Sequence, residues 1–338
     1  MSRRDTSITR RALLGATAAG ATASIVAARA QGTDAAKWPG NRTVRIVVPY
    51  PAGGSTDVLT RILAERLNDK LGGSAWLIEN RPGAGGNIGI DVVARAEPDG
   101  YTIGSATVGH FSINQYLYAK MSWDPDRDLQ PVSMTWELPN VAVVPTQHVP
   151  AKTLAEFIAW AKARDGGIFY GSPGVGTTPH LSGALLATRT GYKGTHVPFR
   201  GAAATIPAML GGDVHFAIDN LASYVGVIES GQMRALAVTS PTRWRTLPEV
   251  PTMAEAGVPD FLVTSWAAFV MPKATPRPIV DKVAAALREI SADPALQARF
   301  EVAGARSLAS TPEEVTALAL KERPMWQEMV RVSGAKLD

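Results

Sequence analysis

The chain has 338 residues, of which 46% are hydrophobic, 19% are charged and none is cysteine, and its formal net charge is +4 at pH 7. This composition excludes an intrinsically disordered chain and, because cysteine is absent, a fold held together by disulfides. The length exceeds the roughly 250–300 residues at which one hydrophobic core stops growing, so we expect two domains.

The first thirty residues are predicted to be an export signal. Its basic start contains Arg3, Arg4, Arg10 and Arg11. A weakly apolar run follows and ends in Ala28-Arg29-Ala30, the small-x-small pattern of a signal-peptidase site, which predicts cleavage near Ala30/Gln31. Residues 9–14 resemble a twin-arginine signal, and the general secretory route is the alternative. The run is too weakly apolar for a convincing membrane anchor.

The export segment also accounts for the positive charge. Five of the 34 basic residues and one of the 30 acidic residues lie in it, which leaves 29 of each and a net charge of zero in the rest of the chain. Nucleic-acid binding would need a basic face, so we expect no nucleic-acid partner. Without a cysteine at the cleavage site the protein has no lipid anchor there, and we expect a free monomer in the periplasm.

After the signal, strand-like and helix-like segments alternate. Short β-branched or apolar runs predict strands at residues 43–48, 76–78, 101–105, 141–144, 168–170 and 195–197. Apolar residues at helical spacing predict helices at residues 55–70, 87–96, 153–162 and 179–190, and only helices from Pro276 onward. Thr153 with Glu156, and Thr311 with Glu314, have the spacing of capping boxes. This order indicates an α/β fold with parallel sheets covered on both faces.

Two further apolar runs, residues 132–137 and 266–271, are placed where the chain would cross between two halves. We interpret them as hinge strands. This interpretation divides the chain into lobe 1 at residues 40–136, lobe 2 at residues 137–265, and a segment at residues 266–338 that returns to lobe 1.

Glycine and hydroxyl side chains gather where predicted strands give way to helices, at residues 53–56, 83–87 and 171–178. Ligands of parallel sheets bind at the carboxyl ends of the strands. Glycine lets backbone N–H groups approach an anion, and a helix N-terminus adds unpaired donors and partial positive charge. Three such loops could clamp a carboxylate, although each alone could be a tight turn. Arg81 and Arg200 are open to pairing with a ligand or to surface salt bridges.

Five motifs in order carry a family resemblance: Pro49-Tyr-Pro-Ala-Gly-Gly-Ser-Thr-Asp57, Glu79-Asn-Arg-Pro-Gly-Ala-Gly-Gly-Asn-Ile-Gly89, Pro98-Asp-Gly-Tyr-Thr102, His196-Val-Pro-Phe-Arg-Gly201 and Leu247-Pro-Glu-Val-Pro-Thr252. From about residue 42 to the C-terminus the chain resembles the substrate-binding receptors of tripartite tricarboxylate transporters, the Bug family. The resemblance implies an α/β type II periplasmic-binding-protein clamshell, with two lobes joined by hinge strands. It also implies capture of a small organic carboxylate for inner-membrane transporter subunits.

The resemblance further implies a site built from backbone amides and hydroxyl groups of both lobes. The ligand-binding residues that we expect are Tyr50, Ala52, Gly53, Gly54, Ser55, Thr56, Asp57, Gly85, Gly86, Asn87, Thr107, Ser172, Gly176, Thr177, His180 and Asp219. Asp57 could instead complement the helix dipole, His180 could be a capping or core residue, and Asp219 could support its loop. Trp136 and Phe199-Arg200 depart from the family pattern, so the particular carboxylate stays open.

No catalytic arrangement is evident in the sequence. The five histidines have no metal-ligand spacing, and there is no Gly-x-Ser-x-Gly motif, cysteine nucleophile or Walker lysine. We therefore expect a binding protein with no cofactor and no metal. Two alternatives remain: a receptor that reports its ligand to a membrane sensor, and, less favoured, an exported α/β enzyme.

Overall fold

The computed structural model describes residues 35–338, so the predicted export signal lies outside the described residues. The described chain contains a ten-stranded sheet in the order β2-β1-β3-β9-β4-β7-β5-β6, with β8 and β10 also paired to β4. Its strands are β1 (Val44–Val48), β2 (Trp76–Asn80), β3 (Thr102–Thr107), β4 (Leu129–Pro145), β5 (Ile168–Ser172), β6 (Gly194–Pro198), β7 (Phe216–Asn220), β8 (Met233–Val238), β9 (Thr264–Pro272) and β10 (Arg306–Ser307).

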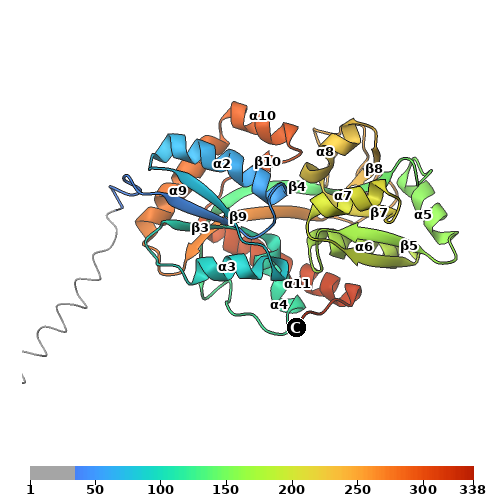
Figure 1. Cartoon of the computed structure of the whole chain (residues 1–338), viewed down its shortest axis with the longest axis horizontal. Helices are drawn as coiled ribbons and strands as arrows, with labels where there is room; N and C mark the ends of the chain where they lie inside the picture. Colours follow the sequence, from blue (N-terminus) through green and yellow to red (C-terminus); the bar gives the residue numbers. More distant parts are fainter. Residues whose placement is uncertain (1–34) are drawn as a thin grey trace, which may run out of the picture.

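Helices cover the sheet in both halves of the molecule (Figure 1). They are α2 (Ser55–Leu71), α3 (Asn87–Ala94), α4 (Asn114–Leu117), α5 (Leu154–Lys162), α6 (Thr178–Thr190), α7 (Ala202–Leu210), α8 (Leu221–Glu229), α9 (Arg277–Ser291), α10 (Pro294–Val302) and α11 (Pro312–Ser333), with a short 3₁₀ turn η1 (Ala84–Gly86) and a π turn η2 (Gly109–Ile113). None of the helices in residues 35–338 has both the length and the apolar character needed to cross a bilayer.

Two lobes are joined by the long strands β4 and β9 (Figure 1). In one lobe β2, β1 and β3 run parallel, and in the other β6, β5 and β7 run parallel. β4 and β9 pair antiparallel and connect the two parallel sets. This confirms the predicted α/β clamshell with hinge strands. Residues 40–136, 137–265 and 266–338 remain our proposed division, and both internal boundaries lie within these two strands.

The course of β4 corrects one prediction. Residues 132–137 and 141–144 were expected to be separate strands, the second in a parallel sheet, but they belong to one 17-residue strand that runs antiparallel to β7. Pro139 lies between the two runs, and proline donates no ladder hydrogen bond. Pro139 pairs with Thr264 at the start of β9, and Asn140 pairs with Asn220 of β7. The proline therefore stands where β4 changes partners, and the strand continues through it.

The C-terminal segment returns to lobe 1 and also touches lobe 2. The amphipathic helix α9 buries Val283, Leu287 and neighbouring apolar residues in a core shared with α2 and β1. Each such buried side chain contributes about 1.5–3 kcal/mol relative to exposure. α11 packs on the other side, against β4 and against α6 of the second lobe. The prediction of helices alone after Pro276 was wrong in one detail, because β10 pairs with β4.

The two predicted capping boxes differ. At the start of α11 the Thr311 hydroxyl accepts from the Glu314 backbone N–H, and the Glu314 carboxylate accepts from the Thr311 N–H, so the box is complete. At the start of α5 the Thr153 hydroxyl accepts from the Glu156 N–H in the same way. The Glu156 carboxylate, however, accepts from the N–H of Lys152, one residue earlier than the box requires. Only half of the second box therefore forms.

Candidate ligand-binding site

A cavity of about 900 Å³, counted with the part that opens to solvent, is lined by residues of both lobes. The residues before β4 are Tyr50, Pro51, Ala52, Gly54, Ser55, Thr56, Gly85, Thr107, Val108, Gly109 and Asn114. The hinge strands contribute Trp136, Ser265 and Trp266. The second lobe contributes Pro173, Val175, Gly176, Thr177, Thr178, Pro179, Arg200, Gly201, Ala202, Ala203, Asp219, Asn220 and Ser223.

Four helices begin at this cavity, because the lining includes the first residues of α2, α6 and α7 and, for α8, the preceding Asn220 and Ser223 of its first turn. The first turn of a helix leaves backbone N–H groups without intrahelical partners and carries a partial positive charge. At α2 and α7 the residue before the helix is a glycine, Gly54 and Gly201, which has no side-chain oxygen to occupy these donors. Converging N-termini with free donors favour an anion.

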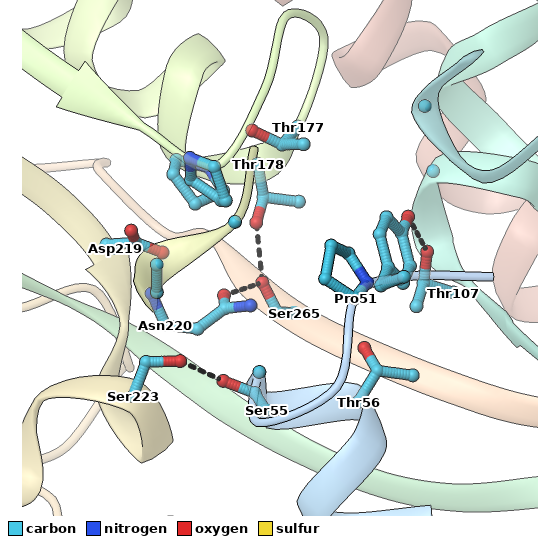
Figure 2. A pocket seen from close by; sticks show the side chains of 18 of the residues that line it. Pro51, Ser55, Thr56, Thr107, Thr177, Thr178, Asp219, Asn220, Ser223 and Ser265 are labelled. Atoms are coloured by element: carbon cyan, nitrogen blue, oxygen red, sulfur yellow. Dashed lines mark hydrogen bonds between the residues drawn. The ribbon is translucent and has the colours of Figure 1, made fainter. Parts of the chain in front are cut away.

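Hydroxyl and amide groups of the two lobes face each other across the cavity (Figure 2). The Ser55 and Ser223 hydroxyls lie 2.8 Å apart, which joins α2 to α8. Ser265 Oγ lies 2.8 Å from Asn220 Oδ1. This contact uses the amide oxygen of Asn220 and leaves its Nδ2 as a donor. The Thr56 hydroxyl has no hydrogen-bond partner among residues 35–338, although Thr56 is only 6% exposed. These two groups are available to a ligand.

The wall formed by Tyr50 and Thr107 is uncharged at neutral pH. The Tyr50 hydroxyl lies 3.0 Å from Thr107 Oγ1, and burial raises the pKa of Tyr50 to about 12. Behind it, the Thr107 backbone N–H donates to His110 Nδ1 at 2.9 Å. Burial lowers the pKa of His110 to about 3, so its ring is neutral and accepts this bond. His110 therefore fixes the position of Thr107 without adding charge.

Two charged side chains line the cavity, and they differ in burial. Asp219 is 1% exposed and accepts from the Asn220 backbone N–H at 2.7 Å and from the Tyr224 hydroxyl at 3.1 Å. Burial raises the pKa of Asp219 to about 7, and no cation pairs with it in the described chain. Arg200 is exposed. The exposed guanidinium of Arg200, together with burial that favours the neutral form of Asp219, leaves the cavity favourable to negative charge.

Ten of the sixteen predicted site residues line the cavity: Tyr50, Ala52, Gly54, Ser55, Thr56, Gly85, Thr107, Gly176, Thr177 and Asp219. The other six are outside the lining: Gly53, Asp57, Gly86, Asn87, Ser172 and His180. The Gly53 N–H donates to Asp57 Oδ2 at 2.9 Å, and Asp57 also accepts from Arg61 and Asn80. Burial alone would raise the pKa of Asp57, but these bonds hold it below its usual value. Asp57 thus stabilises the loop before α2.

The remaining four residues hold neighbouring loops. Gly86 has φ +94°, and a Cβ there would overlap the His110 ring, so only glycine fits. Asn87 Oδ1 accepts from Nδ2 of Asn114, which itself lines the cavity, at 2.8 Å.

Under the loop that precedes α6, two histidine rings stack. The rings of His180 and His196 are 3.8 Å apart, and His196 Nε2 lies 2.7 Å from Ser172 Oγ. His180 Nδ1 accepts from the Gly176 N–H at 3.1 Å, and burial lowers its pKa to about 4. His180 is thus a neutral core residue beneath the loop, which is the alternative that the sequence left open.

Sequence reasoning missed the start of α7, the side of α8, and Ser265. Gly201 followed by Ala202-Ala203-Ala204 is a glycine before a run of strong helix formers, and this signal could have predicted the helix N-terminus. Ser223 and Ser265 carry no comparable local signal. Of the two arginines that sequence left open, Arg81 pairs with Glu79, whereas Arg200 lines the cavity.

A two-lobed α/β clamshell with an anion-favouring cavity between its lobes defines a solute-binding protein. The model of the tripartite tricarboxylate transporter family receptor, TctC, matches residues 59–334. The chain belongs to this family of solute-binding receptors.

Similar proteins agree with this assignment. Protein BugT of Bordetella pertussis (strain Tohama I) is 35% identical over 297 residues, covering 88% of this chain and 90% of BugT. The structure of R. palustris Rpa4515 with adipate has a TM-score of 0.85 and 34% identity, covering 89% of this chain and 100% of that one. MatC (Rpa3494) from Rhodopseudomonas palustris with bound malate has a TM-score of 0.79 and 31% identity, covering 87% of this chain and 100% of the MatC chain.

Proposed function

We propose that this protein captures a small organic carboxylate in the periplasm and delivers it to the inner-membrane subunits of a tripartite tricarboxylate-type secondary transporter. The observation that carries the proposal is the convergence of four helix N-termini, from two lobes, on one cavity. Membership of the receptor family supports the transporter partner. The adipate and malate bound by two similar proteins support a carboxylate ligand.

In this proposal the carboxylate is held by backbone N–H groups and by the hydroxyl of Thr56 and the amide of Asn220. Both lobes supply donors, so a bound anion favours the closed form, and the closed form is what a transporter subunit would recognise. The proposal is of a monomeric binding protein without cofactor, metal or catalysis. It is exported with cleavage near Ala30/Gln31.

A thermal-shift screen of the purified protein against organic acids at neutral pH tests the ligand class. A ligand at one hundred times its dissociation constant should stabilise the fold by about 2.7 kcal/mol, which raises the melting temperature by several degrees. Thr56→Val removes the free hydroxyl and should reduce the shift. Thr316→Val, which changes a helical threonine outside the cavity, should leave it unchanged. A response to neutral or cationic solutes, with none to carboxylates, would refute a carboxylate ligand.

Deletion of the gene tests the transporter partner. Loss of growth on the identified carboxylate supports delivery for uptake. Unchanged growth with loss of a transcriptional response to the same acid would instead assign the protein to a membrane sensor, because the same clamshell can report its closed form to either partner.

A further inference from the structure

Arg200 is an exposed arginine without a partner among residues 35–338. In residues 35–338, each arginine other than Arg200 and Arg288 has its guanidinium in an ion pair, a hydrogen bond or a contact with an aromatic ring. Arg288 lies on α9, outside the cavity lining, whereas Arg200 belongs to the lining. An unpaired guanidinium is therefore present at the edge of the ligand cavity.

The position of Arg200 separates it from the other donors. It directly precedes Gly201, the residue before α7, and a Cβ built on Gly201 would lie 3.6 Å from Pro51 Cγ of the first lobe. This corner is thus where the two lobes approach each other. Ser55 and Thr56 at the start of α2 are each only 6% exposed, so the helix N-termini act in the interior and Arg200 acts at the mouth.

We infer that Arg200 selects ligands with a second carboxylate, one carboxylate being held at the helix N-termini and the other at the guanidinium. This inference rests on the proposed function and adds the residue that holds the second carboxylate. A monocarboxylate would leave the Arg200 donors in water. A dicarboxylate of suitable length offers two oxygens to the planar fork, which can bind a carboxylate with two parallel hydrogen bonds.

Calorimetry with three pairs of straight-chain acids tests the inference at pH 7.5 and low salt: butyrate with succinate, pentanoate with glutarate, and hexanoate with adipate. Within each pair only the second carboxylate differs. For the best-fitting length, the wild-type protein should bind the dicarboxylate at least about tenfold more tightly than the monocarboxylate.

Substitutions at the two unpaired arginines isolate the effect. Arg200→Gln should weaken dicarboxylate binding about tenfold to a hundredfold and change monocarboxylate binding less than about twofold. Arg200→Lys keeps the charge without the fork and should retain part of the preference. Arg288→Gln removes the same charge outside the cavity and should behave like the wild type. Unchanged melting temperatures without ligand show that the exposed substitutions leave the fold intact.

The results separate the inference from the proposed function. Equal affinity for both acids of every pair overturns the inference, as does an equal loss for both acids in Arg200→Gln or a matching loss in Arg288→Gln. Unchanged dicarboxylate binding in Arg200→Gln also overturns it, and would leave the guanidinium free for a transporter subunit. If no acid binds, either here or in the wider screen, the proposed function itself fails.

Discussion

Gly176 lies at a contact between the two lobes, and its replacement by alanine should weaken ligand binding more than it weakens folding. Its backbone has φ +77°, and a Cβ there would overlap Cδ2 of Leu117 on α4. Leu117 precedes β4 and is only 2% exposed, so it is anchored in the first lobe. The overlap therefore pushes the lobes apart, which opposes the closed form that holds the ligand.

Gly191 provides a matched control for the backbone. It has φ +75°, and a Cβ there would meet nothing within 4 Å. Alanine in the left-handed region costs about 1–2 kcal/mol at either position. The overlap at Gly176 adds about 1–3 kcal/mol, typical of overpacking. If opening of the lobes relieves the overlap, this cost appears in binding, and the dissociation constant should rise about 5- to 150-fold.

Two measurements separate the backbone strain of the alanine variants from an effect on closure of the lobes. Scanning fluorimetry without ligand should show similar losses of melting temperature for Gly176→Ala and Gly191→Ala, because both carry the same backbone strain. Calorimetry with the most stabilising acid should show weaker binding only for Gly176→Ala. Adding Leu117→Val removes the overlapping methyl group and should restore part of the affinity. Equal dissociation constants for the two alanine variants, or no restoration by Leu117→Val, would refute the role of this contact in closure.

The buried Asp219 and the half-buried Glu322 give predictions about stability. The pKa of Asp219 is about 7 against an ordinary value of 3.8, so between these values the folded protein keeps a proton that the unfolded chain has lost. The contribution of Asp219 to the free energy of unfolding is complete below pH 3.8 and falls by up to about 4 kcal/mol as the pH rises through 7. Asp219→Asn should therefore lose less stability than the wild type over this range, as measured by urea unfolding at each pH. An equal loss in the two proteins would contradict this. Glu322 accepts from the indole N–H groups of Trp266 at 2.9 Å and Trp326 at 3.1 Å. Glu322→Ala should cost about 1–3 kcal/mol for each unpaired donor, Glu322→Gln clearly less, and equal losses in urea unfolding would show that these bonds are unimportant.

The fold could be predicted where local signals agree with tertiary packing. The β-branched run at Val44–Val48 favours a strand, and Thr311 favours the start of a helix. The protein adopts both structures. The segments α7, β7, α8 and β8 were missed. Leu221–Glu229 mixes β-branched and aromatic residues with glycine, so its local preference is ambiguous, and burial against β4 and β8 decides its conformation.

The sequence predicted most of the loops that line the candidate cavity, but not which of their side chains point into it. Glycine-rich loops that follow predicted strands can be recognised in the sequence. They are expected to lie together because the carboxyl ends of parallel strands meet at one edge of a sheet. Whether a side chain in such a loop points to the ligand depends on neighbours distant in sequence. Asn87 turns to Asn114 and Ser172 turns to His196, 27 and 24 residues away. Asp57 is different, because its partner Arg61 is four residues later and the helical spacing could have predicted the pair.

The source of positive charge in the cavity has a consequence for how the lobes move. Helix N-termini act only over about one turn, so donors of α2 and donors of α6, α7 and α8 reach the same anion only when the lobes close. Closing without a ligand leaves these N–H groups poorly hydrated, which costs free energy. The neutral bond between Ser55 and Ser223 returns only about 1 kcal/mol. We therefore expect the bound anion, rather than contacts within the protein, to determine when the clamshell closes.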